Sequence, residues 1–138
     1  MIWILNVELI FGAYAKDAWK GAIEIDSSST LEDLHFALQK SLNFDNDHMY
    51  LFYVSKTERS NNRILYDDEN GLIYEKTLED LYPLGKKNKL FYLFDYGDNW
   101  LFKITKSIKK PQRPLQGIEY PRLIEEIGVK PEQYPSCE

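Results

Sequence analysis

Two histidines and two aspartates are the polar residues of this chain that could form a chemical site. His35 lies within a run where leucines recur at helical spacing, and His48 follows an acidic loop. Asp95 and Asp98 lie in a glycine-containing turn between aromatic segments. Imidazole and carboxylate groups can act together as an oriented base or as ligands. We therefore hypothesise that His35, His48, Asp95 and Asp98 converge at one end of the predicted sheet.

Each of the four residues also has a purely structural interpretation. His35 would be a core histidine bonded to a carboxylate or a backbone group, because burial disfavours its charged form. His48 would be a loop residue, and Asp98 would bond the backbone of its own turn. Asp95 stands at the rim of an aromatic face, where it needs a partner that His35 or Lys20 could supply.

No motif in the sequence completes a catalytic or metal site. If Gly71 held the sixth position of a calcium loop, Tyr66 and Thr77 would hold the first and last, and neither can serve. The single cysteine, Cys137, cannot form an intrachain disulfide, and no Cys/His cluster can build a zinc site. There is no phosphate-binding glycine-rich loop and no nucleophile elbow. We predict no metal and no cofactor, and a non-catalytic role is favoured over an enzyme.

A basic run without an acidic residue could contact phosphates; it comprises Lys103, Lys106, Lys109, Lys110 and Arg113. The whole chain has a net charge of −5 and a pI of about 5.1. This argues against a dedicated nucleic-acid binder, whose affinity comes mainly from neutralising phosphates. A solvated strand edge is the simpler interpretation, since lysines there block edge-to-edge pairing.

The elements that would position these residues begin with two strands and a helix. Apolar and polar residues alternate over residues 3–11 and 19–26, which indicates two half-buried antiparallel strands. Thr30 can cap a helix that begins at Leu31 and ends near Asn43. The apolar stripe of this helix, which includes His35, would cover the sheet.

The remaining elements are predicted from short apolar runs and turn signals. In order, they are a strand over 49–55, a hairpin of 64–66 with 72–74 around Asn70-Gly71, a short helical turn over 77–81, a hairpin of 90–95 with 100–108, and a short helical stretch near 122–127.

The second of these hairpins has two aromatic faces. A turn centred on residues 97–98 or 98–99 places Phe91 and Leu93 with Phe102 and Ile104, and we interpret this face as core. The opposite face is the candidate binding surface and carries Tyr92, Phe94, Tyr96 and Lys103. A proline-rich tail supplies apolar residues that could instead cover this face.

These elements indicate a single α+β domain over residues 1–138, with a core over 1–108 and a wrapping tail over 109–138. The expected fold is a mixed or antiparallel sheet covered by one main helix. It resembles a ubiquitin-like β-grasp pattern with an inserted hairpin and a C-terminal proline-rich appendage. No segment approaches the ~20 apolar residues of a membrane helix, and no signal-peptide pattern is present. We expect a cytoplasmic protein without a membrane partner.

Several sequence strings, in this order and spacing, resemble the plasmid pRiA4b open-reading-frame-three-like family, whose members are also labelled passenger proteins of insertion elements. The strings are Trp19-Lys20, Thr30 to His35 with Leu38-Gln39, Phe44-Asp45 with His48, Phe94 to Trp100, Tyr120-Pro121-Arg122 and Pro131-Glu132-Gln133. The resemblance implies a compact α+β domain and an association with mobile elements, and it implies no established reaction.

The sequence is therefore compatible with three candidate functions. The favoured one is a non-catalytic binding or adaptor module that acts on a protein partner through its sheet surface. The second is a mobile-element accessory protein that contacts nucleic acid through the basic run. The third is an enzyme that uses the histidines and aspartates as a cluster.

Overall fold

The alternating apolar residues at the start of the chain form a long antiparallel hairpin in which Leu5 lies opposite Ile23. In the computed structural model, which describes residues 1–135, this hairpin belongs to a seven-stranded sheet. The predicted role of Cys137 lies outside the described residues. The strands are β1 (Ile2–Phe11), β2 (Lys20–Asp26), β3 (Tyr50–Ser55), β4 (Ile64–Tyr66), β5 (Lys89–Phe94), β6 (Trp100–Lys106) and β7 (Arg122–Ile127).

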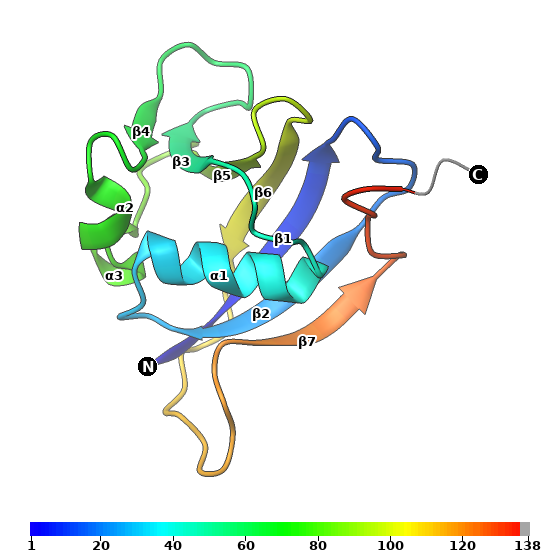
Figure 1. The fold of residues 1–138 in the computed structure, drawn as a ribbon. Helices are drawn as coiled ribbons and strands as arrows, with labels where there is room; N and C mark the ends of the chain where they lie inside the picture. The colour runs from blue at the N-terminus through cyan, green and yellow to red at the C-terminus, as the bar shows by residue number, and fades with distance from the viewer. Residues whose placement is uncertain (136–138) are drawn as a thin grey trace.

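The strand order is β4-β3-β5-β6-β1-β2-β7, and each neighbouring pair is antiparallel (Figure 1). The predicted α+β class with an antiparallel sheet is confirmed. The finer β-grasp pattern is not confirmed, because these antiparallel pairings do not single it out from other helix-covered sheets. Among the helices of residues 1–135, none is long and apolar enough to cross a membrane.

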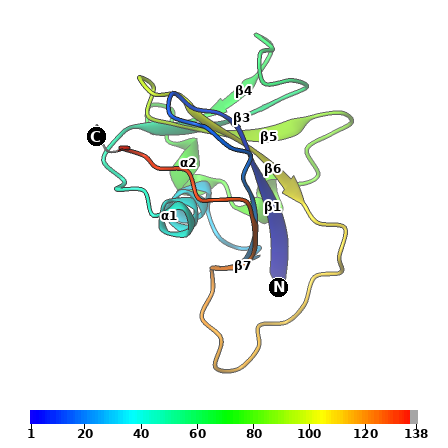
Figure 2. The same cartoon turned by 90° about the vertical axis from the view of Figure 1, so that its right-hand side faces the viewer.

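One helix, α1 (Leu31–Leu42), packs against a single face of the sheet (Figures 1 and 2). It begins where predicted: the Thr30 hydroxyl accepts from the Asp33 backbone N–H, and the Asp33 carboxylate accepts from the Thr30 N–H. Such a reciprocal cap satisfies two backbone donors that the first turn leaves free. Asn43, with φ of 57°, ends the helix. The predicted helix and its cap are confirmed.

The face under α1, here the covered face, holds the core, which includes Leu5, Ile23, Phe52, Tyr92 and Phe102. Among residues 1–135, no helix lies on the opposite face, here the open face (Figure 2). Its side chains come from the strand residues that alternate with those of the core, among them Asn6, Glu8, Lys20, Leu93 and Lys103. The loop over residues 56–63 reaches part of it, where Arg63 lies 4.1 Å from the ring centre of Tyr53.

The predicted hairpin around Asn70-Gly71 is wrong in its second half. Residues 64–66 form β4, but Leu72–Glu75 form a helical turn, α2. The Asn70 side chain accepts from the N–H of Asp67 and of Leu72, which closes the turn locally and starts the helix. The next turn, α3 (Leu78–Leu81), confirms the short predicted helix and repeats the threonine–aspartate cap through Thr77.

The hairpin of β5 and β6 forms with a different pairing from the predicted one. Phe94 pairs with Trp100 and Tyr92 with Phe102, across an odd-length loop over residues 95–99. The predicted turn has an even number of residues, and a one-residue shift in pairing places the β5 side chains on the opposite face relative to β6. The face assignment is therefore wrong for β5, where Tyr92 and Phe94 are 0% exposed and lie in the core under α1, and right for Phe102 and Ile104 of β6.

The segment near residues 122–127 was predicted as helical and is instead the edge strand β7, paired with β2. The proline-rich appendage is not confirmed as such, because β7 is part of the sheet and Leu115 before it is exposed. The connection from β6 to β7 projects away from the sheet (Figure 1). Gly128 ends the strand with φ of 93°, where a side chain would collide with the Ala18 carbonyl.

Candidate functional site

His35 lies on the buried side of α1 and is 1% exposed. Its Nε2 lies 2.5 Å from Asn46 Oδ1, and its Nδ1 lies 2.7 Å from the Tyr92 hydroxyl. Gln39 completes the network, since its amide donates to the same hydroxyl and its carbonyl oxygen accepts from the Asn46 N–H. Both ring nitrogens therefore have partners within the fold, as expected for a buried polar group.

The environment of His35 keeps its ring neutral. Burial lowers the pKa of His35 to about 4, against the opposing effect of the hydrogen bond to Asn46. The ring stacks on Tyr50 with a centroid separation of 3.5 Å. The predicted structural interpretation, a core histidine with satisfied partners, fits this geometry, although the partners are side chains from Asn46 and Tyr92.

His48 belongs to a second cluster that joins three separate segments of the chain. Its Nε2 lies 3.3 Å from Asp95 Oδ2, 3.7 Å from Asp47 Oδ1 and 2.7 Å from the Tyr134 hydroxyl. Tyr134 in turn donates to Asp47 Oδ2 at 2.7 Å. The hydrogen bond from Tyr134 is the main reason that the pKa of Asp47 falls below its usual value. The partner that Asp95 needs is thus His48.

Asp95 also organises the hairpin loop. It adopts φ of 62°, and its Oδ1 accepts from the N–H groups of Gly97 and Asp98 at 3.1 and 3.3 Å. Asp98 thus lies in the turn, but the side chain that bonds the turn backbone is that of Asp95 and not, as predicted, that of Asp98. Burial, followed by the nearby charge of Asp95, raises the pKa of Asp98. The structure thus brings His48, Asp95 and Asp98 together and binds His35 into a separate network.

The two histidines still share one groove of about 280 Å³ beside α1, here the α1 groove. Its walls include Glu32, Phe36, Met49, Asp68 and Tyr74. Sequence reasoning missed these residues, although Phe36 lies outside the apolar stripe of its helix. Within residues 1–135, no group of three or more His, Cys, Asp or Glu side chains is arranged to hold a metal ion.

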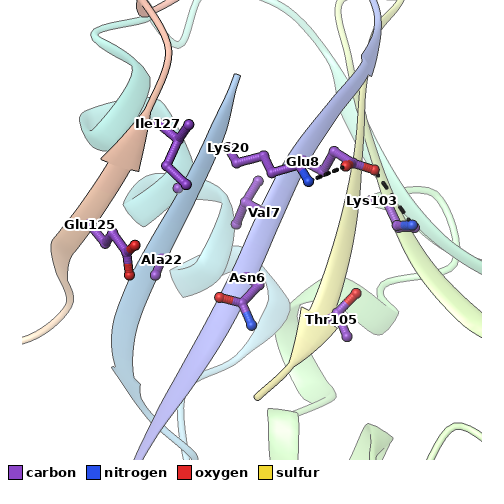
Figure 3. A pocket seen from close by; sticks show the side chains of 10 residues that line it. Asn6, Val7, Glu8, Lys20, Ala22, Lys103, Thr105, Glu125 and Ile127 are labelled. Carbon is purple, nitrogen blue, oxygen red and sulfur yellow. Dashed lines mark ion pairs between the residues drawn. The ribbon is translucent and has the colours of Figure 1, made fainter. Parts of the chain in front are cut away.

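A second groove, of about 360 Å³, runs over β1, β2, β6 and β7 on the open face (Figure 3). Glu8 lies at its centre between two lysines: Lys20 Nζ is 3.3 Å from Oε2, and Lys103 Nζ is 3.5 Å from Oε1. Lys103 is thus the one member of the predicted binding surface that lies here. Tyr96, in the hairpin loop, is exposed and donates to the Tyr50 carbonyl oxygen.

The rest of the predicted basic run lies at the opposite end of β6 from the hairpin loop. Lys106 lies 4.7 Å above the ring of Trp3. Together with Lys86 and Lys89 it lines a hollow of about 470 Å³. None of these three lysines forms an ion pair within the part of the chain that the structure describes.

The sequence of residues 4–133 matches the family model described as plasmid pRiA4b ORF-3-like protein. The chain belongs to this family. The match includes β2 to β7 and nearly all of β1, and it includes both histidines and both aspartates of the candidate site. Tyr134, which binds His48, lies one residue beyond it.

A solved structure has the same fold as this pRiA4b ORF-3-like chain. It is a protein of unknown function, MM3350, from Methanosarcina mazei Go1, with a TM-score of 0.71 and 21% sequence identity. The similarity covers 91% of this chain and 68% of that one. At this identity the likeness concerns the fold alone. No curated protein matches the sequence.

Proposed function

We propose that this pRiA4b ORF-3-like chain is a non-catalytic binding module that holds a protein partner on the open face of its sheet. The observation that carries the proposal is a broad face without a covering helix, crossed by the groove around Glu8 (Figures 2 and 3). A second hollow of about 380 Å³ adjoins Phe11, Leu93 and Leu101 on the same face. Two neighbouring hollows on one face offer contacts to a protein partner that spans both of them.

The chemistry of the open face fits a protein partner. Ile10 and Phe11 at the end of β1 are exposed, and so is Leu65 on β4. Charged groups flank this apolar zone, with Glu8 held between Lys20 and Lys103. Protein interfaces combine an apolar centre with a polar rim in this way. The partner we propose therefore presents apolar side chains to Phe11 and polar side chains to Glu8 and its two lysines.

A catalytic role has less support from the geometry. His35 has both ring nitrogens engaged, and Glu8 is already paired with two lysines. A general base needs a free lone pair within hydrogen-bond reach of a substrate proton. His48 contacts Tyr134 and Asp95 through Nε2, and these contacts tie three segments of the chain together.

The experiment is capture of partners from a native lysate by the wild type and by matched variants. Phe11→Ser lies on the open face, and Leu115→Ser is an equally exposed control on the projecting connection. We expect a protein that is captured by the wild type and by Leu115→Ser but lost with Phe11→Ser. Purified partner and chain should then reproduce this difference. If both variants and the wild type capture the same proteins equally, the open face is not the binding surface.

A second candidate function rests on the unpaired lysines. Lys86, Lys89 and Lys106 border one hollow, and Lys109 and Lys110 follow on the connection to β7. An accessory protein of a mobile element could use this cluster to contact phosphates. Binding of DNA or RNA should then weaken steeply with salt and be lost in a Lys106→Glu/Lys109→Glu variant. Failure to bind either nucleic acid at low salt would remove this candidate.

A further inference from the structure

The α1 groove combines aromatic side chains with carboxylates and contains no lysine or arginine. Phe36, Tyr74 and Met49 stand along it with exposed fractions of 49, 51 and 56%. Isolated exposed apolar residues are normal on protein surfaces, but several around one groove mark an interaction site. The groove lies on the helix side of the molecule, so it is separate from the surface of the proposed function.

The floor of the groove is rigid and uncharged. Tyr50 stacks on His35 at an interplanar angle of 2°, and His35 is fixed by Asn46 and Tyr92. Ile73 closes the floor and is 1% exposed. An incoming side chain would therefore meet preformed aromatic faces and would not have to order them. Such preorganisation lowers the entropic cost of binding.

Two carboxylates from different elements border this floor. Glu32 lies in the first turn of α1, and Asp68 lies in the acidic turn before α2. Both residues line the groove together with Tyr50, and burial, followed by the charge of Glu32, raises the pKa of Tyr50. Neither forms an ion pair within residues 1–135. Their negative charge is therefore open to a ligand.

We propose that the α1 groove binds a lysine or arginine side chain presented by a basic segment of a partner protein. A cation is attracted to the faces of aromatic rings, and two nearby carboxylates add to the attraction. The methylene stem of the basic residue would pack on Phe36 and Met49. A volume of about 280 Å³ fits one long side chain, since pockets for drug-sized ligands begin near ~300 Å³.

The partner is a protein segment because the rim extends beyond a single side chain. Phe36, Met49 and Tyr74 are each about half exposed, so they offer contacts to residues on either side of the inserted cation. Tyr, Phe and Met are the residues in which protein interfaces are enriched.

The test uses the whole chain and two synthetic peptides, followed by amide chemical shifts. One peptide has lysines separated by glycines, and the other is identical with each lysine acetylated. We expect the free-lysine peptide to shift the resonances of Phe36, Met49 and Tyr74 and the acetylated one to leave them in place. Binding should weaken as salt is raised, because the attraction is electrostatic.

Variants make the test specific to the groove. Glu32→Gln combined with Asp68→Asn should weaken binding of the free-lysine peptide roughly tenfold, which corresponds to about 1.4 kcal/mol. Glu69→Gln is the matched control, because Glu69 lies in the same acidic turn and does not line the groove; it should change binding less than about twofold. Thermal unfolding of each variant checks that the fold is retained.

Three outcomes would overturn the proposal. Equal binding of the acetylated peptide would show that charge is not recognised. Shifts confined to other parts of the chain would place the peptide elsewhere. Shifts in the groove that appear with rising protein concentration and without peptide would make a second copy of the chain the occupant. None of these results depends on whether the open face binds a protein.

Discussion

The polar groups of the covered face are buried and hydrogen-bonded to one another, whereas those of the open face lie at the surface. Under α1, the side chains of His35, Gln39, Asn46 and Tyr92 form a closed network of hydrogen bonds away from water. On the open face, Glu8 and its lysines meet at the surface, where water can replace any of them. Buried polar groups must be satisfied internally, whereas exposed ones can exchange partners. The covered face thus fixes the fold, and the open face is where we propose that a partner binds.

The largest expected effect comes from truncating adjacent residues of β5 that lie on opposite faces. Phe94→Ala should lower the free energy of unfolding by about 3–5 kcal/mol, because it empties a fully buried site. Leu93→Ala, its neighbour on the open face, should cost less than about 1.5 kcal/mol, because its side chain is only partly buried and has less burial to lose. Denaturant unfolding measures both. If Leu93→Ala proved the costlier change, the face assignment would be reversed.

Acid should weaken the covered face through His35. Its pKa is about 4 in the fold against 6.5 when unfolded. Between these values the unfolded chain binds more protons, so stability is full above pH 6.5 and falls as the pH drops toward 4. The loss is up to about 3 kcal/mol. Unfolding free energies measured from pH 7 to pH 4 give the size of this loss.

The matched comparison for this pH effect is a pair of histidine variants. His35→Gln removes the titrating group, so the difference in stability between it and the wild type should shrink as the pH falls. His48→Gln keeps the buried histidine and should show the same decline as the wild type. Parallel curves for the wild type and His35→Gln would mean that the pKa of His35 is the same in the folded and unfolded chain.

Removing one hydroxyl from the covered network should have a smaller effect. Tyr92→Phe leaves His35 Nδ1 and the Gln39 amide without their shared partner and should cost about 1–3 kcal/mol. The control is Tyr96→Phe, whose hydroxyl is exposed and bonds the Tyr50 carbonyl. Chemical denaturation of both variants should separate them by at least about 1 kcal/mol. An unchanged free energy of unfolding in Tyr92→Phe would show that the network adds nothing to stability.

The smallest effect is expected on the open face. Glu8→Gln abolishes the pairing with Lys20 and Lys103 and should change stability by less than about 1 kcal/mol, because exposed ion pairs contribute little. The same variant should weaken capture of an open-face partner measurably, since charge complementarity guides association. A large loss of stability with unchanged binding would reverse the proposed division between the two faces.

Local signals in the sequence predicted the first half of the fold. The alternation in β1 and β2, and Thr30 with Asp33 at the start of α1, depend on residues that are neighbours in the chain. The same signals failed where the outcome depended on distant partners. Residues 122–127 form a strand because the edge of β2 is available to pair with them. Asn70-Gly71 begins a helix because the Asn70 side chain closes the turn.

The candidate site was predicted only in part, for a related reason. The need of Asp95 for a partner could be seen from its place beside an aromatic face, and His48 meets that need. The sequence does not indicate that the loop over 95–99 has an odd number of residues. The loop takes this length because Asp95 and Asn99 both adopt positive φ and lengthen the turn. Tyr134 and Gln133 reach the site from the end of the described chain. No local pattern could indicate that contact.

The place of β1 in the sheet has a consequence for how the protein forms during synthesis. β1 precedes β6 in synthesis by most of the described chain, yet one of its edges pairs with β6. Until Lys106 has left the ribosome, that edge has no partner and the apolar residues of β1 and β2 are covered by α1 alone. Contacts between such distant segments make folding slow. Nascent chains that stop before β6 should therefore need a chaperone to remain unaggregated.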